Sequence, residues 1–212
     1  MWSIADLADA IEAGLVRENA RLAAERAVYG LDAREEVQLH PLLAAALIDA
    51  GYGIAREQRY PADQALRRDS EGERCDLVIT PDHRPLITGE TRATLFEPAD
   101  AIPFDEAFWL EVKTVAQHTI DGPNASYASQ LLSTIRQDIT KLAKDRGILH
   151  AGLLILMFVG DETVAAHDLG IWQDRCLKRG MPIAAPSRRN VPITDRMGNT
   201  VCAIALYPVR HW

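Results

Sequence analysis

The chain has 212 residues, of which 48% are hydrophobic, and a formal net charge of −7. This length and apolar content predict one domain over residues 1–212 with a sizeable core. The acidic total argues against a protein that binds a polyanion through its overall charge, although local basic groups such as Arg67-Arg68 can still contact phosphates.

The sequence predicts a cytoplasmic protein without a membrane partner. It has no run of 18 or more apolar residues, and Asp6 and Asp9 stand where a signal peptide would be basic. The three cysteines, Cys75, Cys176 and Cys202, are widely spaced and predict neither a disulfide framework nor a zinc site.

Two helices are predicted at the start of the chain. Apolar residues recur at helical spacing over residues 3–28, within an N-terminal helical arm of residues 1–30. This helix packs either on the body of the protein or on a second subunit, so a homodimer stays open. A second helix is expected over residues 33–50, and Pro41 either kinks it or marks its true start.

The remaining elements predict an α/β protein with a mixed central sheet flanked by helices. Strands are expected at residues 54–60, 75–80, 108–115 and 152–159, an extra hairpin at 86–88 and 91–96, helices along 128–142 and 163–179, and a last hairpin joining 190–194 to 201–207. The run 152–159 is apolar throughout, which is typical of a central strand covered on both faces. The long helix before it predicts a crossover between two parallel strands.

The most informative strand is Phe108–Val115, because it carries Glu111 and Lys113 inside an apolar run. Alternate side chains of a strand share a face, so these two charges point the same way. Burying an ion is costly unless it is paired or coordinated, so this face is predicted to hold a site. Asp76 begins another strand, and if the two strands are neighbours, its carboxylate can converge with Glu111 beside Lys113.

Two carboxylates with no nitrogen or sulfur ligand suit Mg²⁺ or Mn²⁺. Such an ion polarises a phosphoryl oxygen and activates water, while an ammonium stabilises charge that develops at phosphorus, so the three groups predict phosphodiester cleavage. Simpler roles stay open: Asp76 can be a structural hydrogen-bond acceptor, and Glu111 and Lys113 can form an ion pair on a sheet face.

Asp76 together with Glu111-Val112-Lys113 in an apolar strand resembles the PD-(D/E)XK, or restriction-endonuclease-like, nuclease superfamily. The order of elements over residues 33–160 is similar to the α-β-β-β-α-β core of that superfamily, with residues 161–212 adding a helix and a hairpin. The resemblance implies that Asp76, Glu111 and the Val112 carbonyl hold the metal and that Lys113 is the catalytic lysine. Glu73 stands near the place where the family often has a proline.

Many members of the superfamily also supply a glutamate from the first core helix. Glu36 falls on the same stripe as the leucines of its helix and points toward the core side, which makes it the candidate. Its alternative role is that of a first-turn glutamate stabilised by the helix dipole. His40, one turn further, is expected to be structural and has no catalytic role in this prediction.

Other polar residues are predicted to lie away from the metal. Gln130 and Lys141 fall almost opposite the apolar stripe of their helix, which favours a solvated or DNA-facing edge. Glu57 shares a face with Arg59 if its strand is regular.

The expected function is that of a metal-dependent nuclease that hydrolyses phosphodiester bonds of nucleic acid, with DNA the expected partner and Mg²⁺ or Mn²⁺ the cofactor. The main alternative is a catalytically inactive nuclease-like scaffold that acts as a binding or regulatory module. A third, a small-molecule phosphohydrolase, requires a closed pocket.

Overall fold

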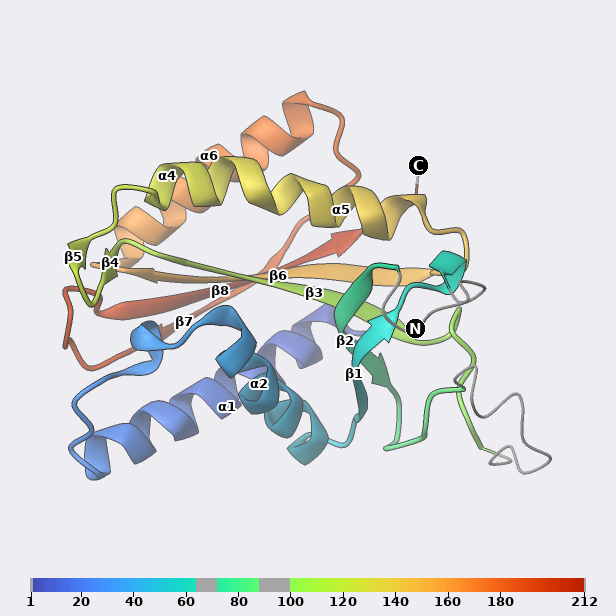
Figure 1. The fold of residues 1–212 in the computed structure, drawn as a ribbon, viewed down its shortest axis with the longest axis horizontal. Coiled ribbons are helices and arrows are strands. Elements are labelled where there is room, and N and C mark those ends of the chain that lie inside the picture. The colour runs from blue at the N-terminus through green and yellow to red at the C-terminus, as the bar shows by residue number, and fades with distance from the viewer. Residues whose placement is uncertain (1, 64–71, 88–99, 212) are drawn as a thin grey trace.

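The computed structural model describes residues 2–63, 72–87 and 100–211, and its central feature is a six-stranded sheet (Figure 1). In chain order the strands are β1 Gly53–Arg59, β2 Arg74–Thr80, β3 Phe108–Ala116, β6 His150–Val159, β7 Ser187–Pro192 and β8 Val201–Val209. In space their order is β1-β2-β3-β6-β8-β7. Only β3 and β6 run parallel, so the sheet is mixed.

Helices cover both faces of this sheet (Figure 1). The helices α1 Ile4–Ala24 and α2 Glu36–Asp49 lie on one face, and α4 Tyr127–Ser129, α5 Ile135–Lys144 and α6 Glu162–Lys178 lie on the other. A small two-stranded ribbon, β4 His118–Thr119 with β5 Gly122–Pro123, stands at one end. The predicted α/β class, with a mixed sheet flanked by helices, is therefore confirmed.

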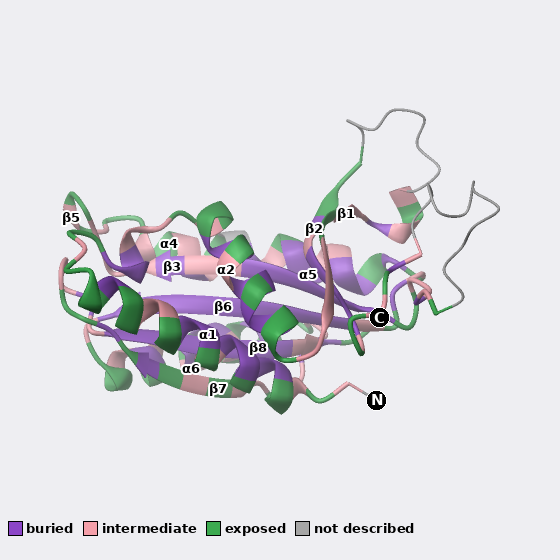
Figure 2. Cartoon of the chain, turned by 90° about the horizontal axis from the view of Figure 1, so that it is seen from below, coloured by how far each residue is buried: buried purple, intermediate pink, exposed green. Residues whose placement is uncertain are grey.

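The core lies in two layers, one on each face of the sheet. Strand β6 has nine buried residues because both of its faces are covered (Figure 2). Its residues Leu153 and Ile155 belong to the apolar cluster beneath α5 and α6, whereas Leu154 and Leu156 belong to the cluster beneath α1 and α2. Because successive side chains of a strand point to opposite faces, β6 contributes residues to both apolar clusters.

Helix α1 packs on the body of the protein, which was one of its two predicted partners. Its buried residues Leu7, Ile11 and Leu15 join the cluster shared with α2 and the sheet. The two helices approach closely at Gly14, where an added Cβ would lie 2.3 Å from the Cβ of Ala46. None of the helices in the described ranges is long and apolar enough to cross a membrane.

Helix α2 begins at Glu36, later than predicted, because Leu31–Ala33 forms a separate 3₁₀ turn. The side chain of Gln38 accepts a hydrogen bond from the Glu35 N–H and so caps the start. Pro41 neither ends the helix nor marks its start: the helix continues through it to Asp49.

The long helix predicted after β3 is interrupted. A π-helical turn, Gln130–Thr134, separates α4 from α5. A wider turn advances the chain by one extra residue, so side chains before it are rotated by about 100° relative to those in α5. The hairpin predicted at residues 86–96 lies almost entirely outside the described residues; within them, Leu86 forms an isolated bridge with Ile102.

Candidate functional site

The candidate site lies where β2 separates from β3. The last pair between these strands is Leu77 with Leu110, which places Asp76 and Glu111 across from each other one position further on. Beyond that pair, side-chain carboxylates accept hydrogen bonds from β3 N–H groups that a paired strand would otherwise bind. The N–H of Val112 donates to Asp76 Oδ2 at 2.8 Å, and the N–H of Thr114 donates to Glu36 Oε2 at 2.9 Å.

These hydrogen bonds also indicate where the Val112 carbonyl points. In an extended strand the N–H and C=O of one residue face the same edge. Because the Val112 N–H faces Asp76, its carbonyl is directed into the same gap between β2 and β3. The gap therefore gathers a strand carboxylate, a helix carboxylate and a backbone oxygen.

Glu111 is a buried carboxyl group. It is 3% exposed, and the hydroxyl of Tyr60 donates a hydrogen bond to it. Burial, followed by the charge and hydrogen bonding of the adjacent Asp76, raises the pKa of Glu111 to about 9. Asp76 and Glu111 thus form a close pair of carboxyl groups.

Lys113 is an ammonium enclosed by carboxylates. Its Nζ lies 2.9 Å from Glu36 Oε1 and 3.6 Å from Asp138 Oδ2. Burial lowers the pKa of Lys113, but Glu36 and Asp138 outweigh it, so the net effect is a raised pKa. Lys113 is therefore positively charged, and the arrangement favours charge stabilisation over a role as general base.

The structure brings together all four side chains that the sequence selected: Asp76, Glu111, Lys113 and Glu36. Glu36 faces the sheet as its helical stripe predicts. Its two oxygens are used by Lys113 and by the Thr114 N–H, so in this structure it holds the lysine and the strand in place.

Sequence reasoning missed His40, which extends this cluster on the α2 side. His40 is 3% exposed, with Nε2 3.9 Å from Asp76 Oδ1 and Nδ1 3.7 Å from Glu57 Oε1. Neither ring nitrogen has a hydrogen-bond partner among the described residues. The sequence feature that points to His40 is its position one turn after Glu36, on nearly the same side of the helix.

Glu57 reaches this cluster because β1 is irregular there. The pairing of β1 with β2 passes from Arg56 with Leu77 to Gln58 with Cys75 and omits Glu57. Glu57 has a left-handed backbone, with φ of +52°, and it is the only residue other than glycine with a positive φ within a described strand. The placement predicted for a regular strand, on the face of Arg59, does not apply to it.

Asp138 is a second acid that the sequence did not single out. It is buried in α5 and lies between Lys113 and Lys141, with its Oδ1 3.5 Å from Lys141 Nζ. Lys141 also lies 3.3 Å from Glu73 Oε1. Lys141, which was predicted to lie on a solvated or DNA-facing edge, is partly exposed, and its ammonium lies between two acids.

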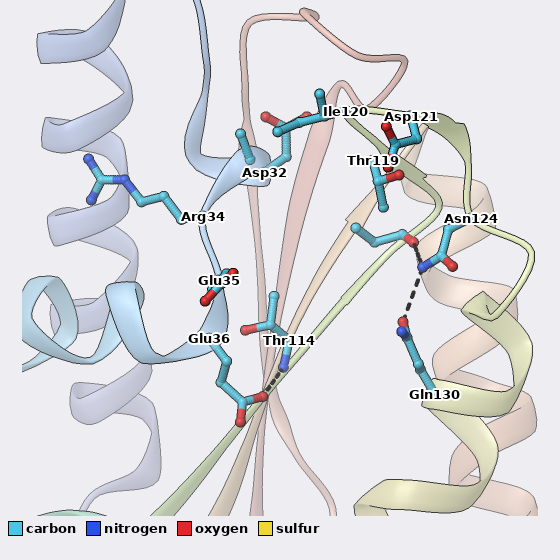
Figure 3. A pocket seen from close by; sticks show the side chains of 12 residues that line it. Asp32, Arg34, Glu35, Glu36, Thr114, Thr119, Ile120, Asp121, Asn124 and Gln130 are labelled. Atoms are coloured by element: carbon cyan, nitrogen blue, oxygen red, sulfur yellow. Dashed lines mark hydrogen bonds between the residues drawn. The ribbon is translucent and has the colours of Figure 1, made fainter.

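A polar cavity of about 400 Å³ adjoins the Glu36 end of the site. Figure 3 shows Glu36 and Thr114 on its floor and the paired side chains of Asn124 and Gln130 on one wall. Asn124 Nδ2 donates to Gln130 Oε1 at 3.1 Å. Gln130 was predicted to face away from the site; it lines this cavity because the π-helical turn rotates it relative to α5.

Two overlapping groups could hold a cation. Asp76, Glu111 and the Val112 carbonyl offer oxygen ligands only, as the sequence predicted. His40, Glu57 and Asp76 form a mixed group, because each offers a ligand atom and these atoms lie within 4.8 Å of one another. Comparison of the chain with protein-family models, curated proteins and solved structures gives no match.

Proposed function

We propose that this protein is a metal-dependent nuclease with a restriction-endonuclease-like core, and that it hydrolyses phosphodiester bonds of nucleic acid, with DNA the expected substrate. The observation that carries the proposal is the pairing of Asp76 with Glu111 beside the Lys113 ammonium at the point where β2 and β3 separate.

The order of elements supports the fold assignment within this proposal. Helix α2, strands β1, β2 and β3, helix α5 and strand β6 follow one another as in an α-β-β-β-α-β core. Asp76 stands in the second of these strands, and Glu111 and Lys113 stand in the third. Both acidic positions therefore fall where the superfamily places its metal ligands.

The side chains present fit a divalent cation. Asp76 and Glu111 are adjacent carboxyl groups, and burial, followed by the charge of Asp76, raises the pKa of Glu111 to about 9. Hard oxygen ligands of this kind suit Mg²⁺ or Mn²⁺, held by Asp76, Glu111 and the Val112 carbonyl. The chemistry supplied by such an ion is polarisation of a phosphoryl oxygen and activation of a water molecule.

The remaining roles belong to the chain itself. Lys113 presents a fixed ammonium to the negative charge that develops at phosphorus. Glu36 and Asp138 position this ammonium from opposite sides of the sheet, since one belongs to α2 and the other to α5. Both keep the lysine protonated, so it stabilises charge and orients the substrate.

One observation favours the alternative of an inactive scaffold. Lys113 is already paired with Glu36 and Asp138, so its charge is largely neutralised within the protein. In an active enzyme the lysine must still attract a phosphate despite these two neighbours. Cleavage measurements separate the two functions.

The test is incubation of the purified protein with supercoiled, linear and single-stranded DNA and with RNA, in Mg²⁺ or Mn²⁺. We expect metal-dependent cleavage by the wild type and loss of cleavage by orders of magnitude in Lys113→Ala, with metal binding retained. Lys178→Ala, an exposed lysine of α6, is the control and should cleave like the wild type. Metal binding without cleavage of any substrate would establish the scaffold instead.

A further inference from the structure

His40 is a buried polar side chain without a partner. Its two ring nitrogens face carboxylate oxygens at 3.7 Å and 3.9 Å, and neither makes a hydrogen bond with a described residue. Hydrogen bonds from a nitrogen to a carboxylate are shorter, at about 2.7–3.2 Å. Because buried polar groups are rarely left unsatisfied, this spacing fits a ligand shared by His40 and the two carboxylates.

The residues around His40 have the spacing that a shared ion requires. His40 comes from α2, Glu57 from β1 and Asp76 from β2, and one ligand atom from each lies within 4.8 Å of the others. Asp76 is fixed in place by the Val112 N–H, which occupies Oδ2 and leaves Oδ1 directed at His40. Glu57 has a side chain that is 51% exposed, so an ion can enter from solvent on its side.

The backbone of Glu57 supports the same interpretation. A left-handed conformation is unfavourable for a residue with a Cβ, and such strain concentrates at functional sites. At Glu57 this conformation interrupts the pairing of β1 with β2, and the carboxylate comes within 3.7 Å of His40. A regular strand would keep the ladder intact at this position.

We propose that His40, Glu57 and Asp76 form a second cation site, distinct from the Asp76 and Glu111 pair, that selects a first-row transition-metal ion over Mg²⁺. The selection follows from the imidazole, because nitrogen ligands favour transition-metal ions, whereas Mg²⁺ prefers oxygen ligands and retains its water. The two groups share Asp76, but Glu111 lies on the same face of β3 as Trp109, which is the α5 side of the sheet, whereas His40 belongs to α2 on the other side. Metal binding at this second site does not depend on cleavage activity.

The test is a Co²⁺ titration of the full chain in a large excess of Mg²⁺, followed by visible absorption. We expect the wild type to bind one Co²⁺ under these conditions. His40→Gln and Glu57→Gln should each weaken Co²⁺ binding by at least about tenfold, a change of about 1.4 kcal/mol. Two controls, His167→Gln and Glu162→Gln in α6, should bind Co²⁺ like the wild type.

A further variant separates this inference from the proposed nuclease. Glu111→Gln should lose cleavage but retain the Co²⁺ site, whereas Asp76→Asn should lose both. If Glu111→Gln and His40→Gln weaken Co²⁺ binding equally, there is a single shared ion and the second site is wrong.

Coordination of Co²⁺ by a histidine can also be detected directly in the wild type, which keeps the test valid if His40→Gln does not fold. A Co²⁺-bound imidazole gives strongly shifted proton resonances in the NMR spectrum, and we expect one such histidine in the presence of excess Mg²⁺. Absence of a shifted histidine, or Co²⁺ that is fully displaced by Mg²⁺, overturns the proposal.

Discussion

The Asp76 carboxylate occupies the position that a strand would otherwise fill, because its Oδ2 accepts the Val112 N–H at 2.8 Å beyond the last β2–β3 pair. The acid is thus tied to the backbone of the strand that carries Glu111 and Lys113. Glu36 makes the corresponding contact with Thr114. The two contacts fix the spacing between acids from three elements before any ligand binds.

This contact predicts that two replacements of Asp76 lower the free energy of unfolding by different amounts. Asp76→Ala leaves the Val112 N–H without its acceptor and should lower the free energy of unfolding by about 1–3 kcal/mol. Asp76→Asn retains an acceptor oxygen and should cost less, while abolishing the rise in melting temperature on addition of Mg²⁺ or Mn²⁺. Urea unfolding and thermal melts measure both effects. Equal destabilisation by the two variants would contradict the role of the Val112 contact.

The pKa of Glu111 predicts how the stability of metal-free protein depends on pH. Burial raises this pKa from an ordinary 4.5 to about 9, so between these values the folded state holds a proton that the unfolded state has lost. The free energy of unfolding should therefore fall as pH rises from about 5 to about 9.

Glu111→Gln, which keeps the neutral form at every pH, removes this contribution. Urea unfolding in EDTA at about pH 6 and about pH 8.5 should show a smaller decrease for this variant than for the wild type. The exposed replacement Glu162→Gln serves as control and should follow the wild type. A decrease of the same size in Glu111→Gln and the wild type would mean that Glu111 is not the titrating group.

Lys113→Ala should also affect stability. It removes a cation that lies 2.9 Å from Glu36 and 3.6 Å from the buried Asp138; among the described residues, Lys141 then remains as the cation that pairs with Asp138. We expect a loss of about 1–3 kcal/mol in the free energy of unfolding, since buried acids lose a charged partner. Lys178→Ala, which removes an exposed pair with Asp174, should cost less than about 0.5 kcal/mol. Cleavage assays on Lys113→Ala therefore require concentrations corrected for the folded fraction.

The sequence alone selected the residues at the centre of the candidate site, because they break a local pattern. Glu111 and Lys113 are charges within a buried apolar strand, and Asp76 lies near the start of the apolar strand beside it. Glu36 was found from helical phase, which is reliable over one unbroken helix. Each of these signals lies within a single element.

The parts that the sequence did not predict depend on irregular backbone or on contacts between distant elements. The sequence pattern puts Gln130 and Lys141 on one face only if their helix is continuous, and the π-helical turn at Gln130–Thr134 invalidates that phase. Asp138 gains its role only when α5 packs over Lys113. His40 and Glu57 meet only because one strand residue adopts a left-handed conformation, for which the sequence carries no glycine signal.

The left-handed backbone of Glu57 yields a last prediction, in which stability and metal binding change in opposite directions. This conformation costs a residue with a Cβ about 1–2 kcal/mol, and glycine avoids that cost. Glu57→Gly should therefore raise the free energy of unfolding of the metal-free protein by about 1 kcal/mol, while weakening Co²⁺ binding. Gln58→Gly, at the next position in regular extended backbone, is the matched control and should lower the free energy of unfolding by about 0.5–1 kcal/mol. If both glycines destabilise the protein equally in urea, Glu57 is not strained. If Glu57→Gly stabilises the protein and Gln58→Gly destabilises it, the conformation at Glu57 is strained. That strained conformation is the one that brings the carboxylate beside His40.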